Sequence, residues 1–214
     1  MLAAPHSPSI ALARYIPSDS SPDTDPASSF WTGASSVVAS NDALGQPVPG
    51  HATEIRAQWT PGSLYLLFSC SYIELHLKPD PVTTEETNKL WNWDVAEAFI
   101  GSDSKNIRRY KEFEVSPQGE WVDLDIDLDS PYPGAGWVWQ SGIQAAARID
   151  EAERVWFAFM RIPWAALDVR PSPGVELRIN FYRAQGPQPK VVAWQPTHQP
   201  TFHVPQAFGT LQLL

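Results

Sequence analysis

The segment from residue 121 to residue 129, WVDLDIDLD, alternates apolar and acidic residues from Val122 onward. A period of two matches an extended strand with one buried face and cannot form the apolar stripe of a helix. Leu124, Ile126 and Leu128 would face the core. No long window elsewhere carries the 3.6-residue period of a helix. We therefore predict an all-β protein in which a solvated sheet face carries Asp123, Asp125, Asp127 and Asp129.

Turn residues divide most of the chain into pairs of strand-like segments. Pro61-Gly62, Gln118-Gly119 and the run 151–153 each separate two apolar-rich segments, which predicts three hairpins. Further strands are expected at 10–16, where the chain would add an edge strand, and at 95–100, 176–185 and 208–214. We predict an antiparallel β-sandwich of jelly-roll or immunoglobulin-like type with about nine to eleven strands. RIPWAAL, at 161–167, is the one short helical turn expected.

Length and composition narrow the possible organisation and partners. The 214 residues suit one domain at 31–214, preceded by an N-terminal arm and a Pro/Ser/Asp-rich loop at 1–30. A net charge of −9 argues against nucleic acid and anionic membranes as partners. The single cysteine, Cys70, allows no intrachain disulfide. The start of the sequence is a poor signal peptide, so the default expectation is a cytoplasmic protein, or a secreted or periplasmic one if a leader precedes it.

The ten tryptophans exceed what a core of this size requires, so some of them are expected to contact a ligand. The chain places aromatic residues beside polar ones in LWNWDVAEAFI, AWQPT and FHVPQAFG. Aromatic faces accept the C–H bonds of a sugar ring, while carboxylate, guanidinium and imidazole groups bind its hydroxyls. The candidate ligand contacts are Trp91, Trp93, Asp94, Glu97, Arg183, Trp194 and His203.

Each candidate also has a structural interpretation. Trp91 and Trp93 would point to the same side if their segment is extended, or one of them would pack as a core aromatic. His203 would be a structural histidine of the last loop or a residue of the pocket rim. Glu97 would bind ligand or pair within the sheet with an arginine, the candidates being Arg56, Arg178 and Arg183.

Six ordered motifs, W-x-x-D-x-x-E-x-F-I, YxEFEVxPxG, RIPW, RxNFYR, AWxPT and FHxPxxFG, resemble the family 9 carbohydrate-binding modules, a group of DOMON-like β-sandwiches. The resemblance implies a non-catalytic module that grips the end of a mono- or oligosaccharide between Trp91 and Trp194, with Glu97 accepting hydroxyl protons. It also implies a role in carbohydrate catabolism beside a partner glycoside hydrolase, and structural calcium. We find no loop with the oxygen-ligand spacing of a dedicated calcium site, so no metal ligand is assigned.

Other functions stay open at this point. Sugar-binding members of the family tend to carry arginine where this chain has Glu114, so a module that lost its sugar site and serves as a protein interaction domain is one alternative. A glycoside hydrolase needs two carboxylates about 5 to 10 Å apart across the sugar, and no such pair is identifiable here. Binding is therefore favoured over catalysis. Haem binding, known in DOMON relatives, would have Met160 as its internal axial ligand.

Overall fold

The computed structural model describes residues 9–130, 139–186 and 191–214, and these residues form an all-β fold, as predicted. Twelve strands are present among them, one more than the upper limit expected: β1 Ile10–Tyr15, β2 Ser36–Ala39, β3 Thr53–Trp59, β4 Ser63–Ser71, β5 Val95–Gly101, β6 Arg109–Val115, β7 Trp121–Asp127, β8 Gln144–Asp150, β9 Val155–Pro163, β10 Glu176–Ala184, β11 Val192–Ala193 and β12 Gly209–Leu213. Four 3-10 turns join them where one was expected: η1 Ser29–Trp31, η2 Leu90–Asn92, η3 Trp164–Leu167 and η4 Pro205–Ala207.

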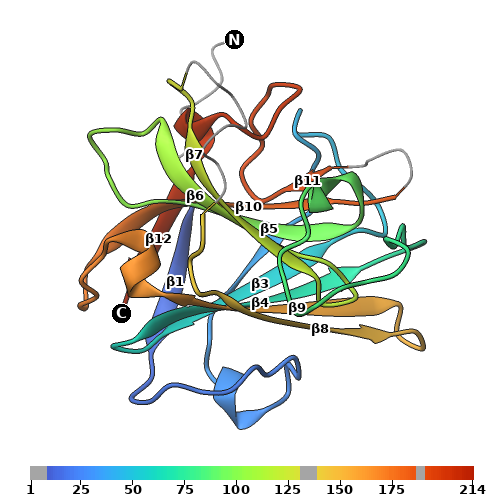
Figure 1. The fold of residues 1–214 in the computed structure, drawn as a ribbon, viewed down its shortest axis with the longest axis horizontal. Helices are drawn as coiled ribbons and strands as arrows, with labels where there is room; N and C mark the ends of the chain where they lie inside the picture. The colour runs from blue at the N-terminus through green and yellow to red at the C-terminus, as the bar shows by residue number, and fades with distance from the viewer. Residues whose placement is uncertain (1–8, 131–138, 187–190) are drawn as a thin grey trace.

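The strands are joined into one continuous hydrogen-bonded sheet rather than the two separate sheets expected. Its order is β7-β6-β5-β10-β12-β1-β3-β4-β9-β8. Two short strands lie outside this order: β11 pairs with β10, and β2 pairs with β3. The sheet folds over itself, so β5, β6 and β7 form a layer above β3, β4, β9 and β8 (Figure 1). The finer jelly-roll or immunoglobulin-like assignment stays a prediction.

Strand β1 connects the two layers. It was expected at an edge, but it lies between β12 and β3 and runs parallel to both, with Ile10 beside Thr210 and Ala13 beside Ala57. Ala11 and Ala13 are buried, and their small side chains permit close packing at the fold between the layers. Residues 10–15 are therefore part of the sandwich.

The three predicted hairpins are confirmed, and their register fixes which side chains share a face. Across the Gln118-Gly119 turn, Lys111 lies opposite Asp125 and its ammonium group reaches that carboxylate at 2.8 Å. Gly119 adopts a φ of +87°, which favours glycine in this turn. Basic residues of β6 and its neighbouring loop neutralise three of the four aspartates, through the pairs Lys111–Asp125, Arg109–Asp127 and Arg108–Asp129. The prediction of a solvated face was wrong for Asp123, which is buried and accepts hydrogen bonds from the backbone N–H and the hydroxyl of Ser141.

Apolar side chains fill the space between the two layers. The largest cluster combines residues of both, among them Ile55, Phe68, Phe113, Trp156 and Phe181, and all of these are buried. Phe68 and Phe181 meet edge to face across the interior, with ring centroids 5.7 Å apart. Burial of apolar area on this scale is the main stabilising contribution to such a fold.

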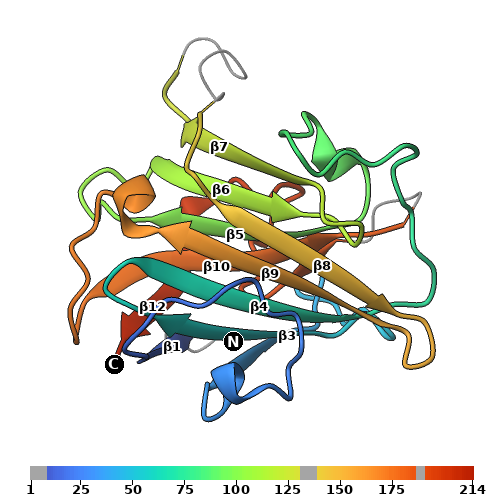
Figure 2. The ribbon, with the colours of Figure 1, turned by 60° about the horizontal axis from the view of Figure 1, so that its bottom comes forward.

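Residues 16–35 form an arm that covers the outer face of β4 and β9; Figure 2 shows it in blue crossing in front of the strands. Trp31, in η1, is buried against Tyr65 and Phe159. The indole N–H of Trp31 donates to the carbonyl oxygen of Asp23 at 3.1 Å, which fixes the turn of the arm. The arm therefore supplies the apolar cover that this face needs.

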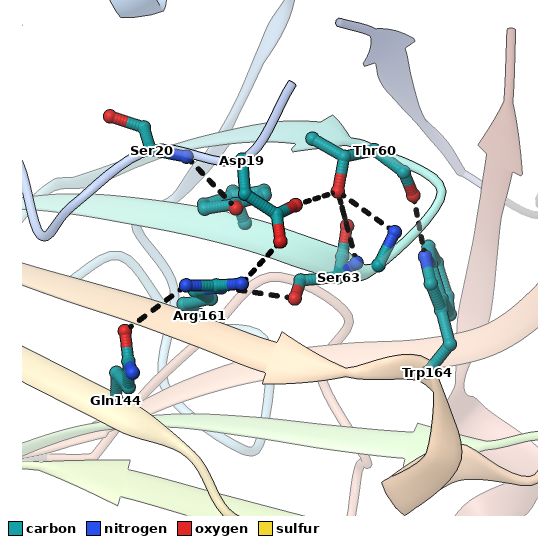
Figure 3. Close-up of polar contacts among 9 residues, drawn as sticks. Asp19, Ser20, Thr60, Ser63, Gln144, Arg161 and Trp164 are labelled. Atoms are coloured by element: carbon teal, nitrogen blue, oxygen red, sulfur yellow. Dashed lines mark hydrogen bonds and ion pairs between the residues drawn. The ribbon is translucent and has the colours of Figure 1, made fainter. Parts of the chain in front are cut away.

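A polar clasp fastens the start of the arm to the sheet (Figure 3). The carboxylate of Asp19 accepts hydrogen bonds from the hydroxyl of Thr60 and the guanidinium of Arg161, and Arg161 also donates to the hydroxyl of Ser63 at 3.1 Å. These donors, the Thr60 hydroxyl first, lower the pKa of Asp19. The neighbouring Ser20 N–H donates to the phenol oxygen of Tyr65 at 3.2 Å.

Candidate functional site

A pocket of about 330 Å³ lies on the outer face of the layer that contains β5, β6, β7 and β10. Turn η2 and the loop that follows β11 contribute side chains to its rim. Its volume is near the lower end of the range for small-molecule sites. The lining residues are Trp91, Glu97, Phe99, Glu112, Leu124, Ala184, Val191, Phe202 and His203.

Strand register brings carboxylates together in the floor of this pocket. Glu97 on β5 lies directly opposite Glu114 on β6, and Phe99 lies opposite Glu112. Neighbours of this kind have Cβ atoms about 5 Å apart, and diagonal neighbours such as Glu97 and Glu112 are roughly 7 Å apart, still within reach of long side chains. Glu97, Glu112 and Glu114 are all at most 4% exposed. Three glutamates therefore share one buried patch.

The carboxylate cluster holds protons more tightly than free glutamates do. Burial raises the pKa of Glu97 and Glu114 well above the usual range, and the neighbouring glutamate charges raise both further. Burial also raises the pKa of Glu112, to about 7. The cluster thus retains protons to a higher pH than free glutamates do, and a protonated carboxyl group can both donate and accept hydrogen bonds.

Aromatic rings form a second part of the pocket. The ring of Phe202 stacks on Tyr182, with centroids 4.0 Å apart and planes inclined by 17°. The Tyr182 hydroxyl donates to the carbonyl oxygen of Phe202 at 3.2 Å and accepts from the amide of Asn180 at 2.6 Å. These contacts hold the loop that carries Phe202 against β10, so the wall is in place before a ligand arrives.

His203 is anchored on two sides. Its Nδ1 lies 2.6 Å from the hydroxyl of Tyr110, and its ring stacks on Phe99 with centroids 5.4 Å apart. Burial lowers the pKa of His203, which favours the neutral imidazole. The two interpretations of His203 are compatible, because this histidine both holds the last loop and lines the pocket.

The predicted site residues of the 90–97 segment separate into two groups. Trp91 and Glu97 line the pocket, and Trp91 is 37% exposed. The segment is not extended, because η2 turns the chain, so Trp93 points elsewhere and stacks on His76 with centroids 4.5 Å apart. Asp94 is buried and accepts the backbone N–H groups of Gly186 and His76, at 2.5 and 3.1 Å. Asp94 therefore ties two loops together.

Trp194 and Arg183 lie away from the pocket. Trp194 is 9% exposed and packs against Phe181 in the main core, with centroids 5.5 Å apart. Arg183 is fully buried on the opposite face of β10, where its Nη1 donates to the carbonyl oxygen of Ser71 at 2.6 Å and its guanidinium lies over Trp156.

The arginines considered as partners of Glu97 bond to other groups. Arg183 donates to Ser71, Arg56 pairs with Glu54 at 2.7 Å, and Arg178 donates to the carbonyl oxygen of Pro205. Neither face of the sheet thus offers Glu97 one of the arginines that the sequence suggested. Glu97 instead faces the pocket beside the other glutamates.

Six lining residues were not among the predicted contacts: Phe99, Glu112, Leu124, Ala184, Val191 and Phe202. For the glutamate and the last phenylalanine of these, the sequence contained a signal. Glu112 follows from the Gln118-Gly119 hairpin, whose register places it opposite Leu124 and on the face away from the aspartates. Phe202 directly precedes His203 in the last motif, so the same loop delivers both side chains.

The residues that the structure describes contain no group of three or more histidine, cysteine, aspartate or glutamate side chains arranged to hold a metal ion. Calcium is also bound by backbone and amide carbonyl oxygens, so the structural calcium that the resemblance implied stays a prediction and no ligand is assigned to it. Met160, considered above as a haem ligand, is fully buried in the main core opposite Leu66 on β4. No helix among the described residues is long and apolar enough to cross a membrane.

Comparison with known proteins identifies the family. The profile of the carbohydrate family 9 binding domain-like proteins matches residues 25–214. The chain belongs to this family. A protein named "Extracellular protein" from Arthroderma benhamiae is 25% identical over 174 residues, which cover 75% of this family 9 chain and 78% of that protein.

Solved structures of similar fold include family 9 modules. A putative carbohydrate-binding protein from Bacteroides uniformis aligns with a TM-score of 0.76 and 17% identity, over 97% of this chain and 100% of that one. A family 9 carbohydrate-binding module from Caldicellulosiruptor kristjanssonii, solved with cellotriose, aligns with a TM-score of 0.66 and 12% identity, over 96% of this chain and 93% of that one. The glucose complex of such a module gives 0.65 and 12%, over 96% of both chains. At sequence identities of 12 to 17%, these comparisons show a similar fold and nothing further.

Proposed function

We propose that this family 9 chain is a non-catalytic carbohydrate-binding module that holds one end of a mono- or oligosaccharide in the pocket beneath Trp91. The observation that carries the proposal is the composition of this pocket, where the aromatic rings of Trp91 and Phe202 lie beside Glu97 and Glu112. Similar family 9 structures that contain cellotriose and glucose support the assignment.

Different residues of the pocket would contact different parts of a sugar ring. Trp91, partly exposed at the rim, offers its face to the C–H bonds of the sugar. Phe202 supplies a second aromatic surface, the part that the sequence assigned to Trp194. Glu97 and Glu112 bind hydroxyl groups, and protonated glutamates can donate as well as accept. Hydrolysis of the polysaccharide would then be left to a separate glycoside hydrolase, with this module in an accessory role.

Calorimetric titration with glucose, cellobiose, xylobiose and galactose tests the proposal. Wild type should bind at least one of these sugars saturably, and Trp91→Ala should weaken binding by at least tenfold, because stacking on an aromatic face is lost. Trp93→Ala is the matched control, since Trp93 stacks on His76 outside the pocket lining and its loss should leave the affinity nearly unchanged.

Circular dichroism should first establish that both variants are folded. A folded wild type that binds none of the four sugars would contradict the proposal. Equal loss of binding in both variants would contradict the assignment of Trp91 as the stacking surface.

A further inference from the structure

The pocket floor carries acidic groups without compensating positive charge. Among the described residues that line the pocket there is no lysine or arginine, whereas Glu97 and Glu112 both line it. Glu114 completes the patch beside them. One oxygen of Glu112 and both oxygens of Glu114 are buried without a hydrogen-bond partner among the other described residues, and the two carboxyl groups interact with each other and with Glu97. Buried carboxylate oxygens in this state are costly, and a ligand that supplies donors would remove that cost.

The cations of neighbouring strands are committed to other groups. Arg183 lies on the opposite face of β10, and Arg178 donates to the carbonyl oxygen of Pro205. Lys111, next to Glu112 in sequence, points to the other face of β6, where it pairs with Asp125 and lies over Trp139 at 4.2 Å from the ring centroid. Among the residues that the structure describes, these basic side chains therefore leave the acidic patch available to a cation from outside.

We propose that the preferred ligand is a sugar bearing a protonated amine, such as glucosamine, whose ammonium group lies against Glu97 and Glu112. This inference rests on the proposed function and narrows its substrate class. An ammonium group offers three donors, and charge-assisted hydrogen bonds to carboxylates are about twice as strong as neutral ones. The aromatic faces of Trp91 and Phe202 add a favourable environment for a cation.

Binding of a cation should release protons from the cluster. Burial raises the pKa of Glu112 to about 7, so this group is mostly protonated at pH 6, and an adjacent ammonium would favour its ionised form. About one proton should then leave for each amino sugar bound. The titratable groups that face Glu112 or act on it come from β5, β6, β10 and the last loop: Glu97, Tyr110, Glu114, Tyr182 and His203.

Calorimetry at pH 6 in two buffers of different ionisation enthalpy tests both parts of the inference. The ligands are glucosamine, glucose, N-acetylglucosamine and the β-1,4-linked glucosamine disaccharide, which distinguishes a free amino sugar from the end of an amino-sugar chain. We expect glucosamine or its disaccharide to bind at least tenfold more tightly than glucose, with release of about one proton. In Glu112→Gln the ratio of glucosamine to glucose affinity should fall to about one.

Asp125→Asn is the matched control, because Asp125 lies on the other face of β7 and should not influence that ratio. N-acetylglucosamine has the same attachment point without the charge and should bind no more tightly than glucose. If glucose binds and the amino sugars bind no better, or bind without proton release, the amine inference fails and the proposed function stands. If no sugar binds to the folded protein, both fail.

Discussion

Replacement of Glu112 by glutamine should change how the stability of the protein depends on pH. In the folded protein the pKa of Glu112 rises from 4.5 to about 7, so between these values the folded state binds more protons than the unfolded state. The free energy of unfolding therefore falls as pH rises through this window. With 1.36 kcal/mol per pKa unit, the loss from Glu112 between pH 5 and pH 8 is about 2 to 3 kcal/mol.

Glutamine does not ionise. Between pH 5 and pH 8 the free energy of unfolding should therefore fall by about 2 to 3 kcal/mol less in Glu112→Gln than in wild type. The raised pKa values of Glu97 and Glu114 act in the same direction, and the missing charge at position 112 should weaken their contribution too. Urea titration followed by tryptophan fluorescence at both pH values measures the difference. Any cost of burying the amide is common to both pH values and cancels.

Glu151→Gln, in the exposed β8–β9 turn, serves as the control and should keep the wild-type difference. A wild type that is as stable at pH 8 as at pH 5 would refute the reasoning. So would a Glu112→Gln variant that retains the full wild-type loss.

Three further predictions concern the scaffold. In Gly209→Ala the new Cβ would lie 2.7 Å from the carbonyl oxygen of Ser9 and 2.7 Å from the ring of Trp194. Thermal unfolding should therefore report a destabilisation of about 1 to 3 kcal/mol. An unchanged melting temperature would show that the surrounding residues move aside without cost. In Asp19→Asn the polar clasp on the arm loses its negative charge. Because that carboxylate is 38% exposed, urea titration should show a loss of only about 1 kcal/mol in the free energy of unfolding, and the arm should become more sensitive to protease. No change in either measurement would assign the stability of the arm to its apolar contacts alone. Cys70 is fully buried with a pKa of about 11, so iodoacetamide should modify it only in denaturant, and rapid modification of the native protein would contradict its placement.

The hairpins could be predicted because each depends on residues that are close in the sequence. Period-two alternation and turn residues such as Pro61-Gly62 define both strands and their register. The position of β1 could not be predicted in this way. Its pairing with β12 depends on residues at opposite ends of the chain, and nothing in its local pattern distinguishes an interior parallel strand from an edge strand.

Strand periodicity could predict the direction of a site residue only where a strand carries it, whereas Trp91 and His203 were predicted from their motifs. Glu97 lies on β5 and faces the pocket as its alternation requires, whereas Trp91, Trp93 and Phe202 lie in turns or loops, whose side-chain directions follow no fixed period. Trp194 shows the same limit: the AWQPT motif suggested a ring that contacts ligand, but the side chain packs on Phe181.

The parallel pairing of β1 with β12 has a consequence for how the protein comes to be folded during synthesis. Ile10 leaves the ribosome 200 residues before its partner Thr210 is made. Until then β1 can pair only with β3, and β10 lacks the neighbour that joins the two layers. Closure between such distant segments is entropically slow. A nascent chain stalled before residue 209 should therefore expose strand edges, which makes it a substrate for chaperones and prone to aggregation.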